Sequence, residues 1–384
     1  MKHIYMDYAA TTPVASEVLK AIKPYFSEKF GNASTLYKLG QDARDAVEEA
    51  RKIAAELIDA QPEEIIFTSG GTEADNLAIK GLAFANKDKK HIIISKVEHH
   101  AVIETCHWLQ KQGYEITYIN VDKYGLVNPK DVENAIRDDT LMVSIMHANN
   151  EIGTIEPIEH IGHLCRSKGV YFHTDAVQTI GKVPINIRKM KIDLLSASSH
   201  KIYGPKGVGF LFVRSGIKIH PLIHGGGQER KMRSGTENVA GIVGFGTALK
   251  LAKKNMIKES KRETRLRNML IKSILKIPKS HLNGHPNKRL PFNTNFWFNS
   301  VEGEALIMML DKMGISSSTG SACSSGSLEA SHVLTAIGLS EEQAHGSLRL
   351  TIGKYTKASD ITHVVHAVNK VVSKLRSISP TWSG

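Results

Sequence analysis

One lysine of the sequence lies where its side chain can act as a nucleophile. Lys201 belongs to the turn-rich stretch 198–207, SSHKIYGPKG, which follows a short apolar strand expected over residues 194–197. Partial burial at such a strand-to-loop junction lowers the pKa of an ammonium group, and the neutral amine attacks aldehydes. The alternative is an ordinary exposed lysine, and Lys201 alone does not decide between the two.

A carboxylate follows another expected strand. Asp175 ends the mainly apolar run 170–174 and precedes Ala176-Val177-Gln178. Its charge is suited to pair with the protonated nitrogen of a pyridine ring, because a protonated ring is the stronger electron sink. A helix N-cap is an equally good explanation for an aspartate at this kind of junction.

A glycine turn followed by a helix start is expected at residues 67–74, FTSGGTEA. Backbone N–H groups at a helix N-terminus, together with the helix dipole, favour a phosphate group. Gly71 lets the backbone approach a ligand closely, and Thr72 adds a hydroxyl donor. The pattern matches neither a Walker A loop nor G-x-G-x-x-G, and a plain capped helix is the alternative.

Two adjacent histidines follow the strand expected over residues 91–95. The imidazole of His99 could stack on a planar ring and move protons near neutral pH. A metal site is disfavoured, because His99 and His100 point in different directions and no helical carboxylate–histidine pair completes a ligand set. A histidine of no special role at a helix start is the remaining alternative.

The sequence has three cysteines, of which Cys323 has the most polar surroundings. It lies in residues 316–327, SSSTGSACSSGS, a composition typical of a solvent-exposed loop, where thiols are reactive. A flexible linker that happens to contain a cysteine is the alternative. Cys106 and Cys165 lie in expected helices and are predicted to be buried and inert. The wide spacing excludes a disulfide framework and a multi-cysteine metal site.

Composition narrows the class of protein. The 384 residues are 41% hydrophobic and 23% charged, which is ordinary for a globular chain of two domains. The net charge of +12 comes largely from residues 250–279. There Leu266, Met269, Leu270 and Ile274 recur at helical spacing, so a solvated helix face is favoured over a nucleic-acid partner. No segment is long and apolar enough to span a membrane and no secretory signal is present, so a cytoplasmic protein is expected.

Strand and helix patterns alternate through the first two-thirds of the chain, which predicts an α/β fold with a mostly parallel sheet. Strands are expected over residues 64–68, 91–95, 116–120, 142–147, 170–174, 194–197 and 209–213. Helices are expected over residues 41–58, 72–85, 101–112, 129–136 and 158–168. A long helix, a strand over 293–299 and a helix over 303–313 follow residue 238. Ligands bind at the carboxyl ends of strands in such sheets, so the clusters after residues 68, 95, 147, 173 and 197 are predicted to form one site.

Together these segments resemble the cysteine desulfurases of the NifS/IscS type, within the fold-type I enzymes that use pyridoxal 5′-phosphate (PLP). The resemblance runs along nearly the whole chain, through many motifs in the right order. They are residues 4–13 (IYMDYAATTP), 30–34 (FGNAS), 68–76, 98–99, 149–153 (NNEIG), 173–178, 198–207, 225–229 (GGGQE), 233–238 (RSGTEN) and 320–323 (GSAC).

The resemblance implies a role for each site residue. Lys201 would carry PLP as a Schiff base, Asp175 would pair with the ring nitrogen, and His99 would stack on the ring. Gln178 would donate to the phenolic oxygen. The implied phosphate ligands are Gly71, Thr72, Ser198 and His200, with Thr236 reaching across from the second subunit of a homodimer. Asn150, which would also contact the cofactor, and Arg349 would clamp the substrate carboxylate, since a guanidinium binds a carboxylate bidentately.

The activity implied by the resemblance is removal of sulfur from L-cysteine, giving L-alanine and a persulfide on Cys323. Lys201 and His99 would move the protons, and the persulfide would pass to an iron–sulfur scaffold protein or another sulfur acceptor. The long loop around Cys323 resembles the housekeeping subgroup of the family. The same thiol is a candidate transient ligand of an iron–sulfur cluster.

The implied architecture is a large PLP-binding domain over residues 13–254 and a smaller C-terminal α/β domain over 255–384, joined by residues 1–12. Four positions depart from the family pattern: Tyr37 replaces a common histidine, Lys231 interrupts a stretch that usually contains glycine, and Lys354-Tyr355 replaces Arg-Phe. The nearest alternative is another fold-type I enzyme, an aminotransferase or a kynureninase-like lyase, which needs no mobile cysteine. A basic nucleic-acid-binding or iron–sulfur carrier protein is the alternative from another class.

Overall fold

The computed structural model describes residues 3–319 and 330–382. Its largest sheet has seven strands in the order β2-β8-β7-β6-β5-β3-β4. They are β2 (Ile65–Thr68), β3 (His91–Ser95), β4 (Glu115–Ile119), β5 (Thr140–Ser144), β6 (Tyr171–Asp175), β7 (Leu194–Ser198) and β8 (Gly209–Val213). Only β8 runs against its neighbours, so the predicted mostly parallel sheet is confirmed.

Both faces of this sheet are covered by helices, because successive strand residues point to opposite sides. Ile92, Ile94 and Leu211 pack with α3 (Gly71–Ala85) and α4 (His100–Gln110). Ile93 and Phe210 pack on the other side. The helices there are α1 (Ser16–Ile22), α2 (Lys38–Ile58), α5 (Pro129–Ala135), α6 (Ile158–Ser167) and the first half of α7 (Val239–Ile274). The result is a three-layer α/β/α arrangement.

All the predicted strands and helices of this region are present, and most of their ends differ by a few residues. The strand predicted over 142–147 is wrong at its carboxyl end, since β5 stops at Ser144. The neighbouring β3 has already ended at Ser95, and the N–H of Met146 donates instead to the Glu98 carboxylate at 2.9 Å. The N–H groups of Ile145 and His147 still donate to the carbonyl oxygens of His173 and Asp175 on β6, and the loop that carries Asn150 follows.

A second, antiparallel sheet lies in the C-terminal part, in the order β12-β10-β9. It comprises β9 (Ser280–Leu282), β10 (Asn293–Phe298) and β12 (Ser347–Thr351), and α8 (Gly303–Lys312) and α11 (Ala358–Ile378) pack against it. Short helices α9 (His332–Ala336) and α10 (Glu341–His345) precede β12, and β1 (Ile4–Tyr5) pairs with β11 (Ile315–Ser316). The sequence patterns predicted β10 and α8 but not β12.

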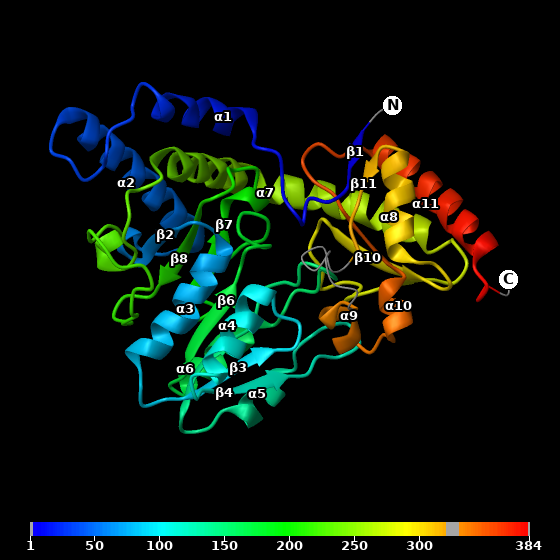
Figure 1. The fold of residues 1–384 in the computed structure, drawn as a ribbon, viewed down its shortest axis with the longest axis horizontal. Helices are drawn as coiled ribbons and strands as arrows, with labels where there is room; N and C mark the ends of the chain where they lie inside the picture. Colours follow the sequence, from blue (N-terminus) through cyan, green and yellow to red (C-terminus); the bar gives the residue numbers. More distant parts are fainter. Residues whose placement is uncertain (1–2, 320–329, 383–384) are drawn as a thin grey trace.

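Helix α7 connects the two parts and runs from one to the other in Figure 1. Phe245 and Leu249 pack in the core of the seven-stranded sheet, whereas Leu266 and Leu270 pack in the core of the second sheet. The domain boundary proposed between residues 254 and 255 would fall within this helix, and it stays a prediction. Among the described residues, no helix is both long enough and apolar enough to cross a bilayer.

The basic half of α7 is amphipathic, with one correction to the predicted apolar stripe. Leu266, Leu270 and Ile274 are buried, but Met269 is 39% exposed. At 100° per residue, Met269 is turned away from the line that joins the other three. The stripe is therefore narrower than predicted.

Candidate active site

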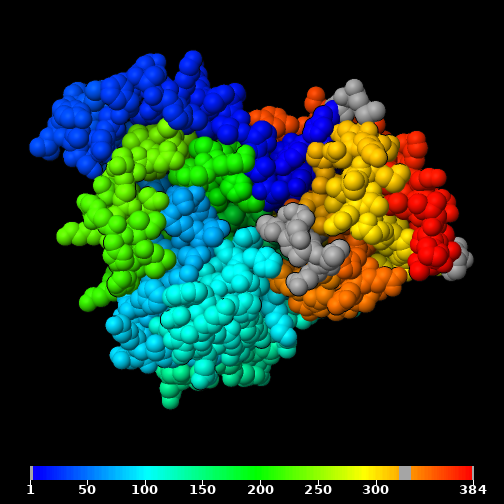
Figure 2. Space-filling model, in the orientation of Figure 1, coloured from blue at the N-terminus to red at the C-terminus, as the bar shows by residue number. Residues whose placement is uncertain are grey.

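A cavity of about 400 Å³ lies where the carboxyl ends of the parallel strands meet the C-terminal part of the chain. The residues that line it include ten of the predicted site residues: Gly71, Thr72, His99, Asn150, Asp175, Gln178, Ser198, His200, Lys201 and Arg349. Figure 2 shows the first residues of the chain (dark blue) between the surfaces of the two parts. Ala9 and Ala10, from this segment, also line the cavity.

The turn that leads into α3, at one end of the cavity, packs closely against the neighbouring chain segments. A Cβ atom on Gly71 would lie 2.7 Å from Cγ2 of Val177, and one on Gly209 would lie 2.8 Å from Cα of Gly70. Real Cβ atoms do not come this close, so β8 needs glycine at position 209 to pass the turn between β2 and α3, and a side chain at position 71 would displace Val177. The N-terminal N–H groups of α3 and the hydroxyl groups of Thr72 and Ser198 thereby lie at the same end of one cavity.

His200 completes this end of the cavity as a neutral imidazole. Burial, and then the charge of Lys201, lower the pKa of His200 to about 4. Nδ1 of His200 lies 3.1 Å from Oγ1 of Thr11, so the N-terminal segment contributes to its orientation. At neutral pH His200 can therefore donate or accept a hydrogen bond here without adding a positive charge.

Asp175 lies at the floor of the cavity and is 6% exposed. One carboxylate oxygen accepts from the N–H of Val177 at 2.8 Å, within a turn rather than a helix. The helix N-cap considered for Asp175 is therefore wrong, because residues 176–180 do not continue as a helix. Burial raises the pKa of Asp175 to about 6, although the charge of Lys201 acts in the opposite direction. A cationic group bound beside it would stabilise the charged form.

Gln178, one turn after Asp175, is 5% exposed. Its amide nitrogen donates to the carbonyl of Ala9 at 3.0 Å. Its amide oxygen is buried without a hydrogen-bond partner. An unsatisfied buried oxygen is costly, so this side chain is a natural contact for a polar ligand in the cavity.

His99 caps α4 and is also neutral. Its Nδ1 accepts from the N–H of Ala101 at 3.1 Å. Burial, and then the charge of Lys201, lower the pKa of His99 to about 4. Because Nδ1 accepts, the proton of the neutral ring is on Nε2.

Lys201 follows β7 and is half-buried in the cavity wall. Its ammonium donates to the carbonyl oxygens of Ala9 at 2.7 Å and Ala10 at 2.8 Å. These bonds hold the side chain across the cavity against the N-terminal segment. The exposed surface lysine considered as the alternative is therefore wrong.

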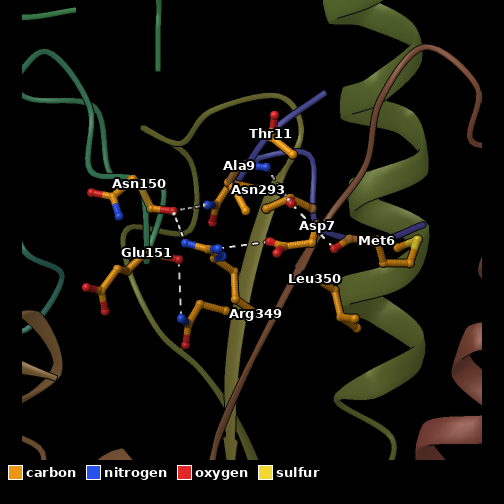
Figure 3. Close-up of polar contacts among 12 residues, drawn as sticks. Met6, Asp7, Ala9, Thr11, Asn150, Glu151, Asn293, Arg349 and Leu350 are labelled. Atoms are coloured by element: carbon orange, nitrogen blue, oxygen red, sulfur yellow. Dashed lines mark hydrogen bonds and ion pairs between the residues drawn. The ribbon is translucent and has the colours of Figure 1, made fainter. Parts of the chain in front are cut away.

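Arg349 on β12 is 2% exposed and approaches the cavity from the C-terminal part. Figure 3 shows its guanidinium between the side chain of Asp7 and the main chain of Asn150. Nη2 donates to Asp7 at 2.9 Å and Nη1 to the carbonyl oxygen of Asn150 at 3.2 Å, while Nε is buried without a partner. Asp7 was not predicted as a site residue, although it lies in the N-terminal motif that carried part of the resemblance.

Several other titratable groups of the cavity wall were missed by the sequence analysis. Glu98 accepts from the hydroxyl of Ser95 at 2.6 Å, and burial raises its pKa to about 8. Burial also raises the pKa of Asp75, which lines the cavity beside Asp175. The remaining ones are Glu151, His100 and His332. No local pattern distinguishes these residues, although Asp75, Glu98 and Glu151 lie inside quoted motifs.

Two predicted site residues do not line this cavity. Thr236 is exposed, and Arg233 of the same segment binds Glu73 of α3 through a 2.8 Å contact. That contact fixes the segment beside the glycine turn of its own chain. Cys323 lies outside the described residues. In the part of the chain that the structure describes, no group of three or more histidine, cysteine or carboxylate side chains could hold a metal ion.

The other two cysteines are buried, as predicted. Burial raises the pKa of the Cys165 thiol to about 12 and that of Cys106 still further. Both thiols are therefore uncharged at physiological pH and unreactive.

The departures from the family pattern lie away from the cavity lining. Tyr37 is 60% exposed, and Lys354 is exposed with its ammonium 3.8 Å from Glu17. Lys231 has φ of +67°, a backbone conformation that favours glycine. Glycine would be the less strained residue at this position.

Comparison with known proteins places this geometry in a family. Residues 4–364 match the model of the class-V aminotransferases. Cysteine desulfurase IscS of Methanosarcina thermophila is 56% identical over 380 residues, 99% of this chain and 94% of the relative. That of Dictyoglomus turgidum is 55% identical over 381 residues, 99% of this chain and 97% of the relative.

Solved structures agree with these relatives. One described as a NifS-like protein has a TM-score of 0.92 at 36% identity, covering 97% of this chain and 100% of the other. Another, described as SspA in complex with cysteine, has a TM-score of 0.82 at 40% identity, with coverage of 92% and 100%. These neighbours confirm the predicted fold type I. The chain therefore belongs to the class-V aminotransferase family and, within it, to the cysteine desulfurases of the NifS/IscS type.

Proposed function

We propose that this chain uses PLP to remove the sulfur from L-cysteine, releasing L-alanine and leaving a persulfide on Cys323. The observation that carries the proposal is the single cavity that gathers a lysine, a buried aspartate, a glycine-turn helix start and a buried arginine. The membership of the chain in the cysteine desulfurase family supports the choice of substrate.

The cavity residues fit PLP. The backbone at Gly71 and the side chains of Thr72, Ser198 and His200 would hold the phosphate, and the half-buried Lys201 would carry the aldehyde carbon. Asp175 would pair with the ring nitrogen, and the Gln178 amide nitrogen, which has a second N–H besides the one donated to Ala9, would donate to the phenolic oxygen. When bound, PLP supplies an electron sink that weakens the bond between the substrate Cβ and sulfur.

Arg349 is suited to the substrate carboxylate. Its guanidinium is fixed by one bond to Asp7 and one to the main chain of Asn150, and its buried Nε–H is unsatisfied. A carboxylate placed at this side chain would gain charge-assisted hydrogen bonds without first ordering the arginine. Asp7 competes for the same guanidinium, so it limits how tightly the substrate is held.

Proton handling falls to two side chains with fixed geometry. Lys201 can give or take a proton at Nζ, which its two carbonyl acceptors hold in the cavity. His99, neutral with the proton on Nε2, is a hydrogen-bond donor at this position in the resting state.

Cys323 completes the reaction in this proposal. Its thiolate attacks the sulfur of the substrate, an S–S bond forms as the Cβ–S bond breaks, and the electron pair of the broken bond stays with the carbon chain. That carbon chain gains a proton and leaves as L-alanine. The persulfide then passes to an iron–sulfur scaffold protein or another sulfur acceptor, and transient cluster ligation by Cys323 stays a prediction, as does a cytoplasmic location.

A homodimer is part of the proposal. Four large apolar side chains between α1 and α2 are strongly exposed in the single chain: Phe26 (71%), Phe30 (65%), Leu36 (82%) and Tyr37 (60%). An apolar group of this kind on a protein surface marks an interaction site. A second copy covering it would agree with the family resemblance, by which Thr236 reaches the phosphate of the partner subunit.

The experiment that tests the function measures alanine and sulfide formed from L-cysteine by the purified, PLP-loaded protein with a thiol reductant. Wild type should form both products, and Cys323→Ala should retain PLP but form almost no alanine. Cys165→Ala, which removes a buried thiol, should keep the reaction. Alanine formation by Cys323→Ala at the wild-type rate would favour a lyase or aminotransferase instead.

A further inference from the structure

A second cavity, of about 300 Å³, adjoins the loop that carries Lys201. Residues 181–182, residues 202–203 and the middle of α7 are among those that line it. Lys201 lines the active-site cavity, whereas Ile202 and Tyr203, the next two residues, line the second one. The lysine loop is therefore a wall of both cavities, and a ligand in the second would contact the segment that positions Lys201.

One face of α7 forms the apolar part of this second cavity. Its lining residues between Ala248 and Glu263 follow the spacing i, i+3, i+4, i+7, i+8, which is one side of a helix. Ala248, Leu251, Ala252 and Met256 make the first half of this face apolar. A mainly apolar lining with a few polar groups is typical of sites that bind small molecules.

Glu263, the last residue of this face, is a buried carboxylate with an exposure of 8%. Nη2 of Arg262 is 4.0 Å away, too far for a hydrogen bond, and the same nitrogen lies 2.9 Å from Glu259. Within the described part of the chain, no hydrogen bond reaches the Glu263 carboxylate. Burial therefore raises the pKa of Glu263, although the charge of Lys182 acts in the opposite direction. A charge in this position is costly unless a donor binds it.

Lys182 brings the opposite charge to the same cavity. It is half-buried, and its Nζ lies 3.6 Å from the centre of the Phe292 ring. The ring face attracts the ammonium, but among the described residues no oxygen accepts a hydrogen bond from it. Burial lowers the pKa of Lys182, although the charge of Glu263 acts in the opposite direction. The ammonium can therefore bind an anionic group of a ligand.

The other charges of the cavity are compensated within the chain. Lys354 lies 3.8 Å from Glu17, and Glu259 has its guanidinium partner. Lys182 and Glu263 attract each other, but no ion pair within 4.0 Å joins them in the described structure. The cavity thus presents one carboxylate and one ammonium that each lack a close partner. A ligand that supplies a group of each charge would remove both costs and stabilise the folded chain.

We propose that this second cavity binds a free α-amino acid with an apolar side chain. The ligand ammonium would bind Glu263, its carboxylate would bind Lys182, and its side chain would lie against the apolar face of α7. An amine or a carboxylate alone would leave one of the two buried charges uncompensated. The site is separate from the proposed carboxylate site at Arg349, and the inference does not depend on the proposed function.

The test compares L-leucine with two analogues that each lack one charged group, by isothermal titration calorimetry of the PLP-loaded wild type. 3-Methylbutylamine keeps the ammonium, 4-methylpentanoate keeps the carboxylate, and both keep the apolar chain. We expect L-leucine to bind with a Kd of about 1 mM or lower. Each analogue should bind at least about tenfold more weakly, because hydrogen bonds to one charged group are lost. This comparison needs no variant, so it holds even where a substitution destabilises the chain.

Two substitutions assign the ligand charges to residues. Glu263→Gln should bind L-leucine no better than 4-methylpentanoate, because the partner of the ammonium is gone. Lys182→Met should bind L-leucine no better than 3-methylbutylamine, because the partner of the carboxylate is gone. Glu104→Gln and Lys218→Met, at exposed positions outside the cavity, should match wild type.

Arg349→Lys separates this site from the active site, and L-leucine binding should be unchanged in it. Binding that is lost in Arg349→Lys but kept in Glu263→Gln and Lys182→Met would place the amino acid in the active site and overturn the inference. No saturable binding of L-leucine up to about 20 mM, or equally tight binding of the two analogues, would also overturn it. None of these measurements uses alanine formation from L-cysteine, so a failure of the proposed function would be seen separately.

Discussion

The two walls of the cavity are built in different ways. The first wall comes from the seven-stranded sheet, where Gly71, His99, Asp175 and Lys201 each lie at or just after the carboxyl end of a strand. The second wall comes from the N-terminal segment and the C-terminal part, and carries Ala9, His332 and Arg349, with Asp7 bound to Arg349. Topology alone brings the residues of the first wall together, whereas those of the second depend on packing between distant segments.

This difference separates the chemistry that each wall is suited to. The sheet wall offers groups for a cofactor: a helix start, a buried aspartate and a lysine. The other wall offers groups for a substrate: an arginine fixed by an ion pair, and the imidazole of His332. A cavity between two separately packed cores can bring cofactor and substrate together while each wall keeps its own geometry.

A substitution in the sheet wall should have the largest effect on activity. Lys201→Ala is expected to abolish alanine formation from L-cysteine, because the residue that carries PLP and moves protons is lost. The protein should hold PLP only non-covalently, so borohydride should no longer fix the cofactor to the chain. Mass spectrometry of the reduced protein measures this directly, with the exposed Lys218→Ala as control.

An active Lys201→Ala protein with PLP fixed elsewhere would contradict the assignment of the sheet wall. It would also remove the distinction between a cofactor wall and a substrate wall.

Breaking the second wall should weaken substrate binding more than the chemistry. Arg349→Lys replaces a bidentate donor by a point charge, and we expect kcat/KM for L-cysteine to fall about 10- to 100-fold, mainly through KM.

Asp7→Asn removes the carboxylate that competes for Arg349 and should lower KM by about threefold. Steady-state kinetics at saturating PLP measures both. An equal rise of KM in the two variants would mean that Asp7 and Arg349 form a structural pair only.

The two walls were also unequally predictable from the sequence. Strand patterns and glycine turns were sufficient to expect the parallel sheet and to place Gly71, Asp175 and Lys201 in one site. Arg349 was found only through the family resemblance, because no local pattern marked β12. His332 was missed, since a single histidine at a helix start has no periodicity or motif that identifies it.

Some features follow only from three-dimensional packing. The predicted strand 142–147 was too long because the pairing with β3 ends at Ser144, after which the N–H of Met146 donates to Glu98, 48 residues away. Burial of Glu98 and Asp75 depends on the sheet and α3 packing together, and sequence alone gives no exposed fraction. Thr236 and Cys323 stay predictions: the first would act on a partner subunit, and the second lies outside the described residues.

A buried carboxyl group of the sheet wall should control how stability depends on pH. Glu98 has a pKa of about 8 in the folded chain, against about 4.3 for an unfolded glutamate. The folded state therefore binds the extra proton between these values, and the stability it contributes is full below pH 4 and is lost as the pH rises through 8. Glu98→Gln mimics the protonated form, keeping an oxygen for Ser95 and Met146.

The variant should consequently lose less stability than wild type between pH 5 and 9, by about 4 kcal/mol. Denaturant unfolding at several pH values measures the difference. Glu104→Gln is the matched control, since Glu104 is an exposed carboxylate on α4. Parallel pH curves for wild type and Glu98→Gln would show that Glu98 is charged in the folded protein.

The smallest effect is expected at Lys231, where the chain departs from its relatives without touching either wall. Glu229, Arg230 and Lys231 all have positive φ, of 44°, 55° and 67°. Each such residue other than glycine costs roughly 1 kcal/mol, and the turn is held by the buried pair of Arg51 and Glu229 at 2.7 Å. Lys231→Gly should therefore stabilise the protein by about 0.5–1 kcal/mol and raise Tm by about 1–3 °C.

Lys218→Gly, at an exposed position without positive φ, should lower Tm instead, because glycine there only adds freedom to the unfolded chain. Activity should be unchanged in both variants, and a Lys231→Gly protein that loses stability would mean that the lysine side chain contributes more than its backbone strain removes.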